Sequence, residues 1–369
     1  MTLIEMLSSI EDTRKRRGIR HKMPNFLIMC LTAIMSGYTG YREIGRFLKE
    51  NQWEFKKYLT FCKVPTYGSI RRIFMEIDFD DFAQKFNQWT AQFLPMCQGE
   101  TLAVDGKAIA GTIKDPQNNY QNFVSLISVF ASQRGIVLAC DKLENKKESE
   151  IYTVQRLLQA LDIQGEIITL DALHCQKTLE TIIKSKNDYI VQVKGNQKKL
   201  FEQIKANVAT KKYLMHTYQE CSLLRGRDEL RITKVYKNLE GISPEWFGIK
   251  RIIETTRYVK TKKGQTIEIV YHISSVAKNK ADFFANHIRS HWGIENRLHW
   301  VKDVQMKEDK SKTKSGNAPE NLSIMRNISI NLFRLNGKDS IKSAMEWSII
   351  NFKELMNLIY YKSNNCNSM

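Results

Sequence analysis

The sequence predicts an α/β domain preceded by an all-helical segment, and two observations carry this prediction. Residues 1–98 alternate apolar stretches at helical spacing with short polar breaks. From Thr101 onward, three short β-rich runs are followed by alternating helical and β-rich stretches. Three antiparallel strands followed by helix–strand crossovers are the order of a ribonuclease-H-like sheet, in which the first and fourth strands lie side by side. We therefore expect a ribonuclease-H-like domain after the helical segment.

The helical segment, residues 1–98, is expected to form an N-terminal domain of its own. Its apolar runs are separated by short polar breaks, which is typical of helices joined by short loops. The predicted helices cover residues 26–37, 41–50, 53–62, 69–77 and 82–94.

The α/β domain is expected over residues 99–335, with a β-rich insertion over about residues 198–280. A C-terminal helix and tail follow over residues 336–369. Predicted strands cover residues 101–104, 122–131, 135–141, 166–170 and 188–193, with helices over 149–161 and 174–184. The insertion is predicted as a helix over 198–208 and strands over 230–236, 250–259 and 267–275. Later helices are predicted over 281–304, 317–335 and 340–361.

The net charge of the chain is unusual, whereas its 42% hydrophobic content is ordinary. With 57 Lys and Arg against 39 Asp and Glu, the net charge is +18 and the isoelectric point is about 9.5. This excess points to a polyanionic partner, most simply nucleic acid. An anionic membrane surface is the competing partner, but there is no lipidation motif, and the longest apolar run, residues 26–35, is half the length that spans a bilayer. We expect no membrane association.

The cysteines indicate the compartment. All 7 are scattered, and no Cys-x-x-Cys pair occurs. This usage argues against a zinc site or a disulfide framework and favours a reducing compartment, so we expect a cytoplasmic protein.

Three acidic residues are candidates for a common site. Asp105 and Asp171 directly follow the first and fourth predicted strands, whose carboxyl ends meet at one edge of the sheet. Glu295 falls within the inward-facing stripe of the helix predicted over residues 281–304, where an uncompensated carboxylate is costly to bury. Each acid also has a plain structural interpretation: two turn aspartates, and a glutamate paired with His299 or Lys302.

Three converging carboxylates would repel one another unless cations were present. Open sites with hard oxygen ligands suit Mg²⁺ or Mn²⁺, and two such ions clamp the attacking and leaving oxygens of a phosphodiester. The acids therefore predict phosphoryl transfer on nucleic acid. In this hypothesis Asp105 bridges two ions, Asp171 completes the ligands of one, and Glu295 those of the other.

Several basic residues are candidates for phosphate contacts, with solvated surface charge as the alternative for each. Lys302 lies two helical turns after Glu295, and Lys107 and Lys194 lie at strand edges. A basic arm precedes the first core helix, and residues 40–76 fit a helix-turn-helix whose second helix begins near Ser69. The arm and this second helix contribute the candidates Arg14, Arg16, Arg17, Arg71 and Arg72. The insertion adds Arg225, Arg227, Arg231, Lys260, Lys262 and Lys263.

Longer strings around these residues resemble one protein family. They are AVDGKAIAG around Asp105, TLDALHCQK around Asp171, VQVKGNQKKL after it, SHWGIENRLHWVKDV around Glu295, and KSGNAPENLSIMRN downstream. With these strings the chain closely resembles the DDE transposases of the ISAs-one group, also called H-repeat-associated proteins, within the IS-four-like superfamily. The N-terminal region also resembles the associated domain of that family.

The resemblance implies a catalytic triad of Asp105, Asp171 and Glu295, divalent metal, and cut-and-join chemistry on transposon ends. It also implies a homodimer at work, because two double-stranded DNA ends must be brought together. The superfamily's signature helix has Tyr and Arg where this chain has Ile288 and His291, while Glu295 and Lys302 match. His291 is therefore a candidate for DNA contact or for packing alone.

Three hypotheses of function follow. The leading one is an insertion-sequence transposase that cleaves the terminal repeats and joins the freed 3′ hydroxyl to target DNA. A catalytically silent DNA-binding remnant or repressor would instead show salt-sensitive binding without cleavage. A stand-alone nuclease would cleave without strand transfer.

Overall fold

The computed structural model describes residues 1–15, 19–112, 123–143, 147–171, 176–224, 227–262 and 264–360. The chain forms two compact units, each built from segments far apart in the sequence. The first unit holds residues 1–97, 106–153 and 295–369, and the second holds residues 98–105 and 154–294. The domain limits predicted from the sequence stay a prediction. The chain re-enters the first unit at residue 106 and again at residue 295, so neither unit is one continuous stretch of sequence.

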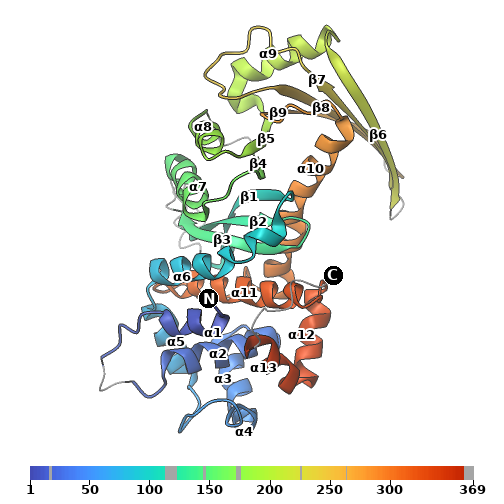
Figure 1. Ribbon diagram of the computed structural model, residues 1–369. Helices are drawn as coiled ribbons and strands as arrows, with labels where there is room; N and C mark the ends of the chain where they lie inside the picture. Colours follow the sequence, from blue (N-terminus) through green and yellow to red (C-terminus); the bar gives the residue numbers. More distant parts are fainter. Residues whose placement is uncertain are drawn as a thin grey trace. The chain divides into compact units, whose positions relative to one another are not determined.

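The first unit begins with helices (Figure 1). Side-chain caps fix several of their starts: Thr2 caps α1, Thr66 caps α5, and Asp78 caps α6. Helices α3 and α5 pack closely at Gly45, where a Cβ would lie 3.4 Å from the Tyr67 backbone nitrogen. The N-terminal helices are α1 (Leu3–Ser9), α2 (Met23–Met35), α3 (Tyr41–Glu50), α4 (Gln52–Phe55), α5 (Tyr67–Glu76) and α6 (Phe79–Ala91).

Helix α11 (Ala318–Leu335) forms the centre of the first unit. It is buried from Ala318 to Arg334 and packs against α2, α5, α6 and the strand β3 (Ile136–Leu143). Its Asn321 side chain donates to the Phe74 and Ile77 carbonyls, and Asn331 bonds both the N–H and the C=O of Val137. These amides satisfy backbone groups that would otherwise be buried without partners. The N-terminal helices therefore share one core with the C-terminal part of the chain.

The first unit also contains the predicted hairpin and the C-terminal helices. The predicted hairpin is confirmed: β2 (Ser125–Ala131) pairs antiparallel with β3, with an irregularity between Val129 and Phe130. The single helix predicted over residues 340–361 is wrong, because α12 (Ile341–Ile350) and α13 (Phe352–Tyr360) are separated at Asn351. The Asn351 side chain bonds the Trp347 carbonyl at the end of α12, and its backbone leaves the helical region.

The second unit is built on a mixed sheet with strand order β1-β4-β5-β9-β8-β7-β6. The first three strands are parallel, and the remaining ones form an antiparallel meander joined to β5 through β9. The β-rich insertion thus extends the sheet. The strands are β1 (Thr101–Ala108, up to Asp105 in this unit), β4 (Ile167–Leu170), β5 (Asp188–Val193), β6 (Leu214–Leu224), β7 (Arg227–Tyr236), β8 (Arg251–Thr261) and β9 (Gly264–Ser274).

The sequence prediction missed β6, whose residues include His, Gln, Glu and Cys between apolar ones. Pairing with β7 along its length makes it a strand. The helices of this part of the chain are α7 (Lys147–Leu161), α8 (Gln176–Lys184), α9 (Lys198–Ala209) and α10 (Ala281–Gly293).

Helix α10 packs along one face of this sheet, against β4, β6, β7 and β8. Phe284 and Ala281 are buried in a cluster with Ile190, Val235 and Ile253 from three strands. Burying a phenylalanine side chain in this way contributes about 2–3 kcal/mol and fixes the helix on the sheet. None of the helices among the described residues combines the length and hydropathy that a bilayer span requires.

Candidate active site

Asp105 and Asp171 lie where the pairing between two adjacent parallel strands ends. In the β1–β4 ladder the last paired residues are Val104 and Leu170. Asp105 is the next residue within β1, which continues to Ala108, and Asp171 directly follows the last residue of β4. Both side chains are half-buried. The prediction that the first and fourth strands lie side by side is confirmed. Asp105, predicted to follow the first strand, lies within it instead, because β1 continues to Ala108.

Lys194 lies at the end of β5, the next parallel strand, and pairs with Asp171. Its Nζ is 2.8 Å from Asp171 Oδ1, with the lysine side chain 51% exposed. An ion pair this open to solvent contributes little to stability, so either group is available to another partner at small cost. The phosphate contact predicted for Lys194 stays a prediction.

Two histidines on α10 bind the strands that end in these aspartates. His287 Nδ1 lies 2.7 Å from Thr101 Oγ1 on β1, and His291 Nδ1 lies 2.9 Å from Thr169 Oγ1 on β4. Burial lowers the pKa of His287 to about 4, so the ring is neutral near pH 7. These bonds position α10, whose chain continues directly into Glu295. The DNA contact predicted for His291 stays a prediction.

A third histidine near this edge, His272 on β9, was not among the predicted site residues. It is buried, and desolvation, followed by the neighbouring His291, lowers its pKa to about 3. In the sequence, the alternation of side-chain direction along β9 is the signal that could have placed His272 on an inward-facing position.

In the first unit, Glu295 begins a stretch of wider helical winding. Residues Ile294–His299 and Val301–Gln305 form π-helical turns after α10. The prediction that Glu295 lies on the inward-facing stripe is wrong, since its side chain is 58% exposed. A π turn inserts an extra residue per turn and rotates all that follows, so Ile294, Leu298 and Val301 take the buried positions.

Glu295 is held by His299, four residues later. His299 Nδ1 lies 3.3 Å from Glu295 Oε2, which confirms one of the two pairings considered for this glutamate. This hydrogen bond, more than the positive charge of Lys107, lowers the pKa of the Glu295 carboxyl and keeps it ionised. The carboxylate is thus oriented by one neighbour and otherwise open.

Lys107 and Lys302, both predicted to contact phosphate, lie instead in a buried charge cluster of the first unit. Lys107 Nζ lies 2.6 Å from Asp303, 3.2 Å from Glu308 and 3.2 Å from Asp309. Lys302 is 2% exposed and donates to Ser323 Oγ at 2.5 Å. A phosphate contact by either lysine would require it to leave these partners.

Glu308 is the centre of this cluster, and sequence reasoning did not single it out. It is 1% exposed, and its carboxylate faces Lys107, Lys302 and Arg326, the last two at 3.5 Å. Burial raises its pKa, but the three cations outweigh that effect and hold the pKa at about 2. The carboxylate therefore stays charged in the core.

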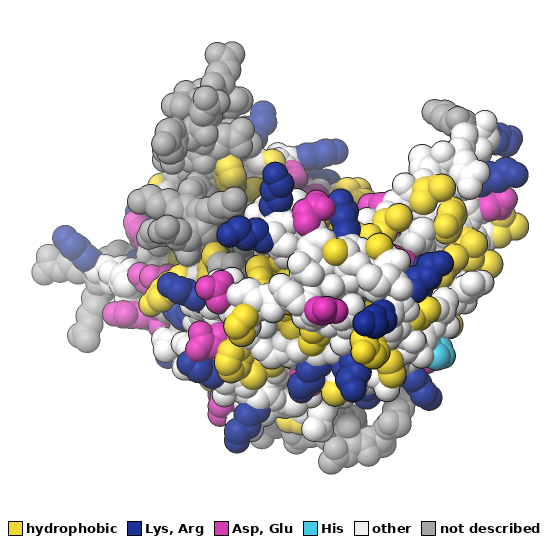
Figure 2. Space-filling view, turned by 90° about the horizontal axis from the view of Figure 1, so that it is seen from above, with side chains coloured by type: hydrophobic (Ala, Val, Ile, Leu, Met, Phe, Trp, Pro, Cys, Tyr) yellow, Lys and Arg dark blue, Asp and Glu magenta, His cyan; other side chains and the backbone are white. Residues whose placement is uncertain are grey.

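Of the predicted basic arm, the structure places only part. Arg14 is bound to Asp12 and to the His21 carbonyl, with its side chain 8% exposed, so its charge is already compensated. Arg16 and Arg17 lie outside the described residues, as do Arg225 and Lys263 in the insertion. Figure 2 shows Lys and Arg side chains scattered over the visible face among acidic and hydrophobic ones.

The predicted helix-turn-helix is wrong in its geometry. Helices α3 and α5 do pack together, but residues 51–66, including α4, separate them, whereas the motif needs a turn of three or four residues. Arg71 and Arg72 on α5 are exposed. On α3, the Arg42 guanidinium carbon lies 5.5 Å from the centroid of the Tyr67 ring. Arg71 and Arg72 therefore give α5 an exposed positive face, although α3 and α5 do not form a helix-turn-helix.

Two family models match this chain. Residues 96–332 match the family model described as "Transposase DDE domain", and residues 4–90 match the one described as "DDE_Tnp_1-associated". The chain belongs to the DDE transposase family.

Relatives of this DDE transposase chain match along most of their length. It is 33% identical to "Putative transposase YncI" of Escherichia coli O157:H7, over 90% of this chain and 87% of that protein. It is 31% identical to "H repeat-associated putative transposase YhhI" of Escherichia coli K12, over 89% of both chains. A solved piggyBac transposase synaptic complex with hairpin DNA is 10% identical with a TM-score of 0.46, covering 99% of this chain and 78% of that one. That likeness is too low to bear on the fold.

The donor atoms of this DDE transposase suit a hard divalent cation. The half-buried carboxylates of Asp105 and Asp171 directly follow the last paired residues of two neighbouring strands. Oxygen ligands that are open on one side are what Mg²⁺ and Mn²⁺ take in phosphoryl-transfer sites.

Proposed function

We propose that this chain is an insertion-sequence transposase with a ribonuclease-H-like catalytic domain. It binds the ends of its element and catalyses metal-dependent DNA cleavage and strand transfer. The observation that carries the proposal is the β1–β4 register, which brings Asp105 and Asp171 to one edge in a chain of the DDE transposase family.

The proposed ligands of the divalent cations are Asp105, Asp171 and Glu295, with two Mg²⁺ or Mn²⁺ ions when DNA is bound. His299, which offers a ring nitrogen beside Glu295, is proposed as a residue that orients this carboxylate. When bound, such ions polarise the phosphodiester and lower the pKa of water. Lys194 compensates the charge of Asp171 in the absence of the ions, and the α10 histidines hold the chain that leads to Glu295.

The proposed partner is double-stranded DNA, namely the terminal inverted repeats and the target. The net charge of +18 supports a polyanionic partner, and the exposed Arg71 and Arg72 are the best placed of the predicted contacts. Two copies are proposed to act together in the synaptic complex. A cytoplasmic, nucleoid-associated location follows from this substrate.

The proposal is tested by incubating the protein with Mg²⁺ and duplexes that carry the cognate terminal repeats. Wild type is expected to cleave and to transfer strands. Asp105→Asn, Asp171→Asn and Glu295→Gln should each lower the cleavage rate by about a hundredfold or more, because each removes a charged metal ligand from the reacting centre. DNA binding without metal should persist in all three.

Asp80→Asn, at an exposed acid near the start of α6, serves as the matched control and should cleave like wild type. Equal cleavage by wild type and the three variants would defeat the catalytic assignment. Binding without any cleavage by wild type would favour a silent DNA-binding remnant or repressor. Cleavage without strand transfer would favour a stand-alone nuclease.

A further inference from the structure

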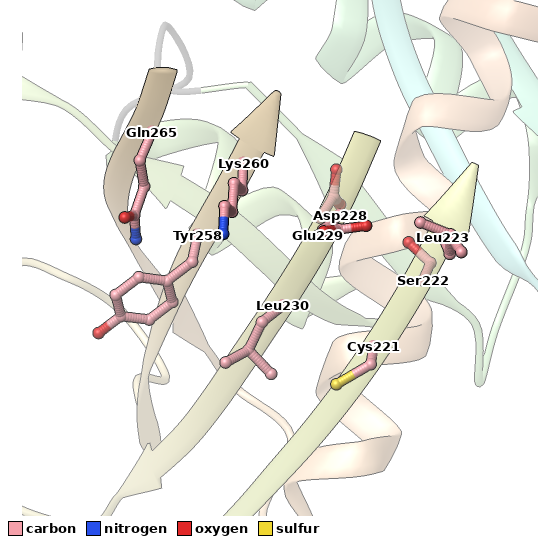
Figure 3. Close-up of a pocket in the computed structure, with 9 residues that line it drawn as sticks. All are labelled: Cys221, Ser222, Leu223, Asp228, Glu229, Leu230, Tyr258, Lys260 and Gln265. Atoms are coloured by element: carbon pink, nitrogen blue, oxygen red, sulfur yellow. The ribbon is translucent and has the colours of Figure 1, made fainter. Parts of the chain in front are cut away.

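The outer half of the β6–β9 sheet carries an apolar band on one face. In the strand registers, Cys221 pairs with Leu230, Leu230 with Tyr258, and Tyr258 with Ile267. Register partners point to the same face of a sheet, so these four side chains form one row across four strands. Figure 3 shows Cys221, Leu230 and Tyr258 side by side on this face. They line a hollow of about 460 Å³.

Large aliphatic side chains on this face are open to solvent. Leu223 is 75% exposed, Ile267 61% and Ile269 52%. On the same face, the ring of Phe201 of α9 packs against Tyr271 near the C-terminal end of β9, with ring centroids 5.6 Å apart. Helix α10 packs on the opposite face, where Arg289 pairs with Glu220. Ile267 and Ile269 lie two residues apart on β9, and Leu223 lies on the same face at the far strand β6. Exposed aliphatic side chains gathered on one face mark a surface that a partner covers.

The balanced charge of this face favours a protein partner over nucleic acid. Asp228 on β7 is the register partner of Lys260 on β8. On the same face, Lys234 Nζ lies 3.0 Å from Glu254 Oε1. Positive and negative side chains therefore balance. Arg231, one of the insertion residues expected to contact phosphate, does not contribute here, because it points to the other face and pairs with Glu229. A neutral apolar surface offers a polyanion no counterion release.

From these observations we infer that this face, the β6–β9 band, is where two copies of the chain associate. Two chains that each carry a net charge of +18 repel one another unless they meet on a neutral surface, and the band is one. In a two-fold contact, the same patch of both copies meets. Asp228 of one copy can then pair with Lys260 of the other copy, and Lys260 of the first with Asp228 of the second. The inference deepens the proposed function, since synapsis requires two copies.

The association is measured without DNA or metal, so its outcome is independent of catalysis. Sedimentation of the full chain over a concentration series should show a monomer–dimer equilibrium. Ile267→Lys and Leu223→Lys should weaken dimerisation by about tenfold or more, because each places a charge on the apolar face that forms the contact. Ile350→Lys, at an aliphatic residue of α12 that is 83% exposed, is the matched control and should not.

A charge exchange distinguishes contact between copies from effects within one copy. Asp228→Lys alone and Lys260→Asp alone should each sediment as monomers, because every facing pair then repels. An equimolar mixture of the two variants should restore the dimer, since all facing pairs become attractive. Circular dichroism checks that each variant is folded.

A monomeric wild type, or equal weakening by Ile267→Lys and Ile350→Lys, would overturn the inference. So would a mixture that stays monomeric. If the band variants weaken binding of a duplex while sedimentation is unchanged, the band contacts nucleic acid instead.

Discussion

At the scale of single residues, the carboxylate that is buried between residues 295 and 308 is that of Glu308, not that of Glu295. The apolar stripe suggested that Glu295 faces inward, but the π-helical turns rotate it to the surface and bury Lys302. Lys302 is tolerated in the core because Ser323 and Glu308 face it. A buried ion cluster of this kind is stable only while all its members are present.

Glu308→Gln tests this cluster. The substitution keeps the shape of the side chain but leaves Lys107, Lys302 and Arg326 facing a neutral amide. We expect the free energy of unfolding at pH 7 to fall by about 3–5 kcal/mol, as measured by urea titration. Asp309→Asn is the control: it also contacts Lys107, but its side chain is 37% exposed, and its effect should be below about 1 kcal/mol.

The same variant has a defined pH dependence. The folded-state pKa of Glu308 is about 2, below its usual 4.5, so the carboxylate stabilises the fold fully above pH 4.5. This contribution is lost as the pH falls from about 4.5 towards 2. The decrease in unfolding free energy across this window should be shallower in Glu308→Gln than in wild type; parallel curves would contradict the assignment.

At the scale of elements, the loop before α11 is held against the end of α5. Gly316 has a φ of +58°, and a Cβ there would lie 2.7 Å from the Met75 carbonyl oxygen. Asn317 and Asn321 bond the Ile77 carbonyl in the same region. The chain therefore needs glycine at position 316 for both its conformation and its closeness to α5.

Gly316→Ala should lower the free energy of unfolding more than strain alone does. Gly337→Ala is the control, since Gly337 has a φ of +71° but open space around it. Left-handed strain costs about 1–2 kcal/mol in both variants, and the backbone overlap should add about 1–3 kcal/mol at position 316. Urea unfolding of the two variants measures the difference, and equal losses would mean that the α5 contact contributes nothing.

At the scale of the whole molecule, the positive charge of +18 should appear as salt-dependent DNA binding. The Arg71→Gln, Arg72→Gln double variant should bind duplex DNA more weakly. The slope of log affinity against log salt should become shallower by about two, because two phosphate contacts are removed. Fluorescence anisotropy at several salt concentrations measures both.

Lys342→Gln with Lys353→Gln removes the same charge from exposed positions of α12 and α13 in the same unit. This control should leave the slope close to that of wild type. If both double variants lower it equally, the α5 arginines act only through net charge, and the positive face of α5 is not a DNA contact.

The sequence by itself determined those features that depend on neighbours along the chain. Alternation and apolar spacing gave most strands and helices, the β2–β3 hairpin, and the strand order that places Asp105 and Asp171 at one edge. The motif strings around the acids were sufficient to suggest the DDE transposase family. Such patterns are local, and their periods of 2 and 3.6 residues are set by backbone geometry.

Only the tertiary structure decided what depends on distant partners. The polar strand β6 exists because β7 pairs with it, and the exposure of Glu295 follows from the π turns that bring Leu298 and Val301 into the core. Whether Lys302, Lys107 and Arg14 face solvent depends on acids such as Glu308 and Asp12. A side chain's charge is visible in the sequence, but its partner is set by packing, because burial makes an unpaired charge too costly to keep.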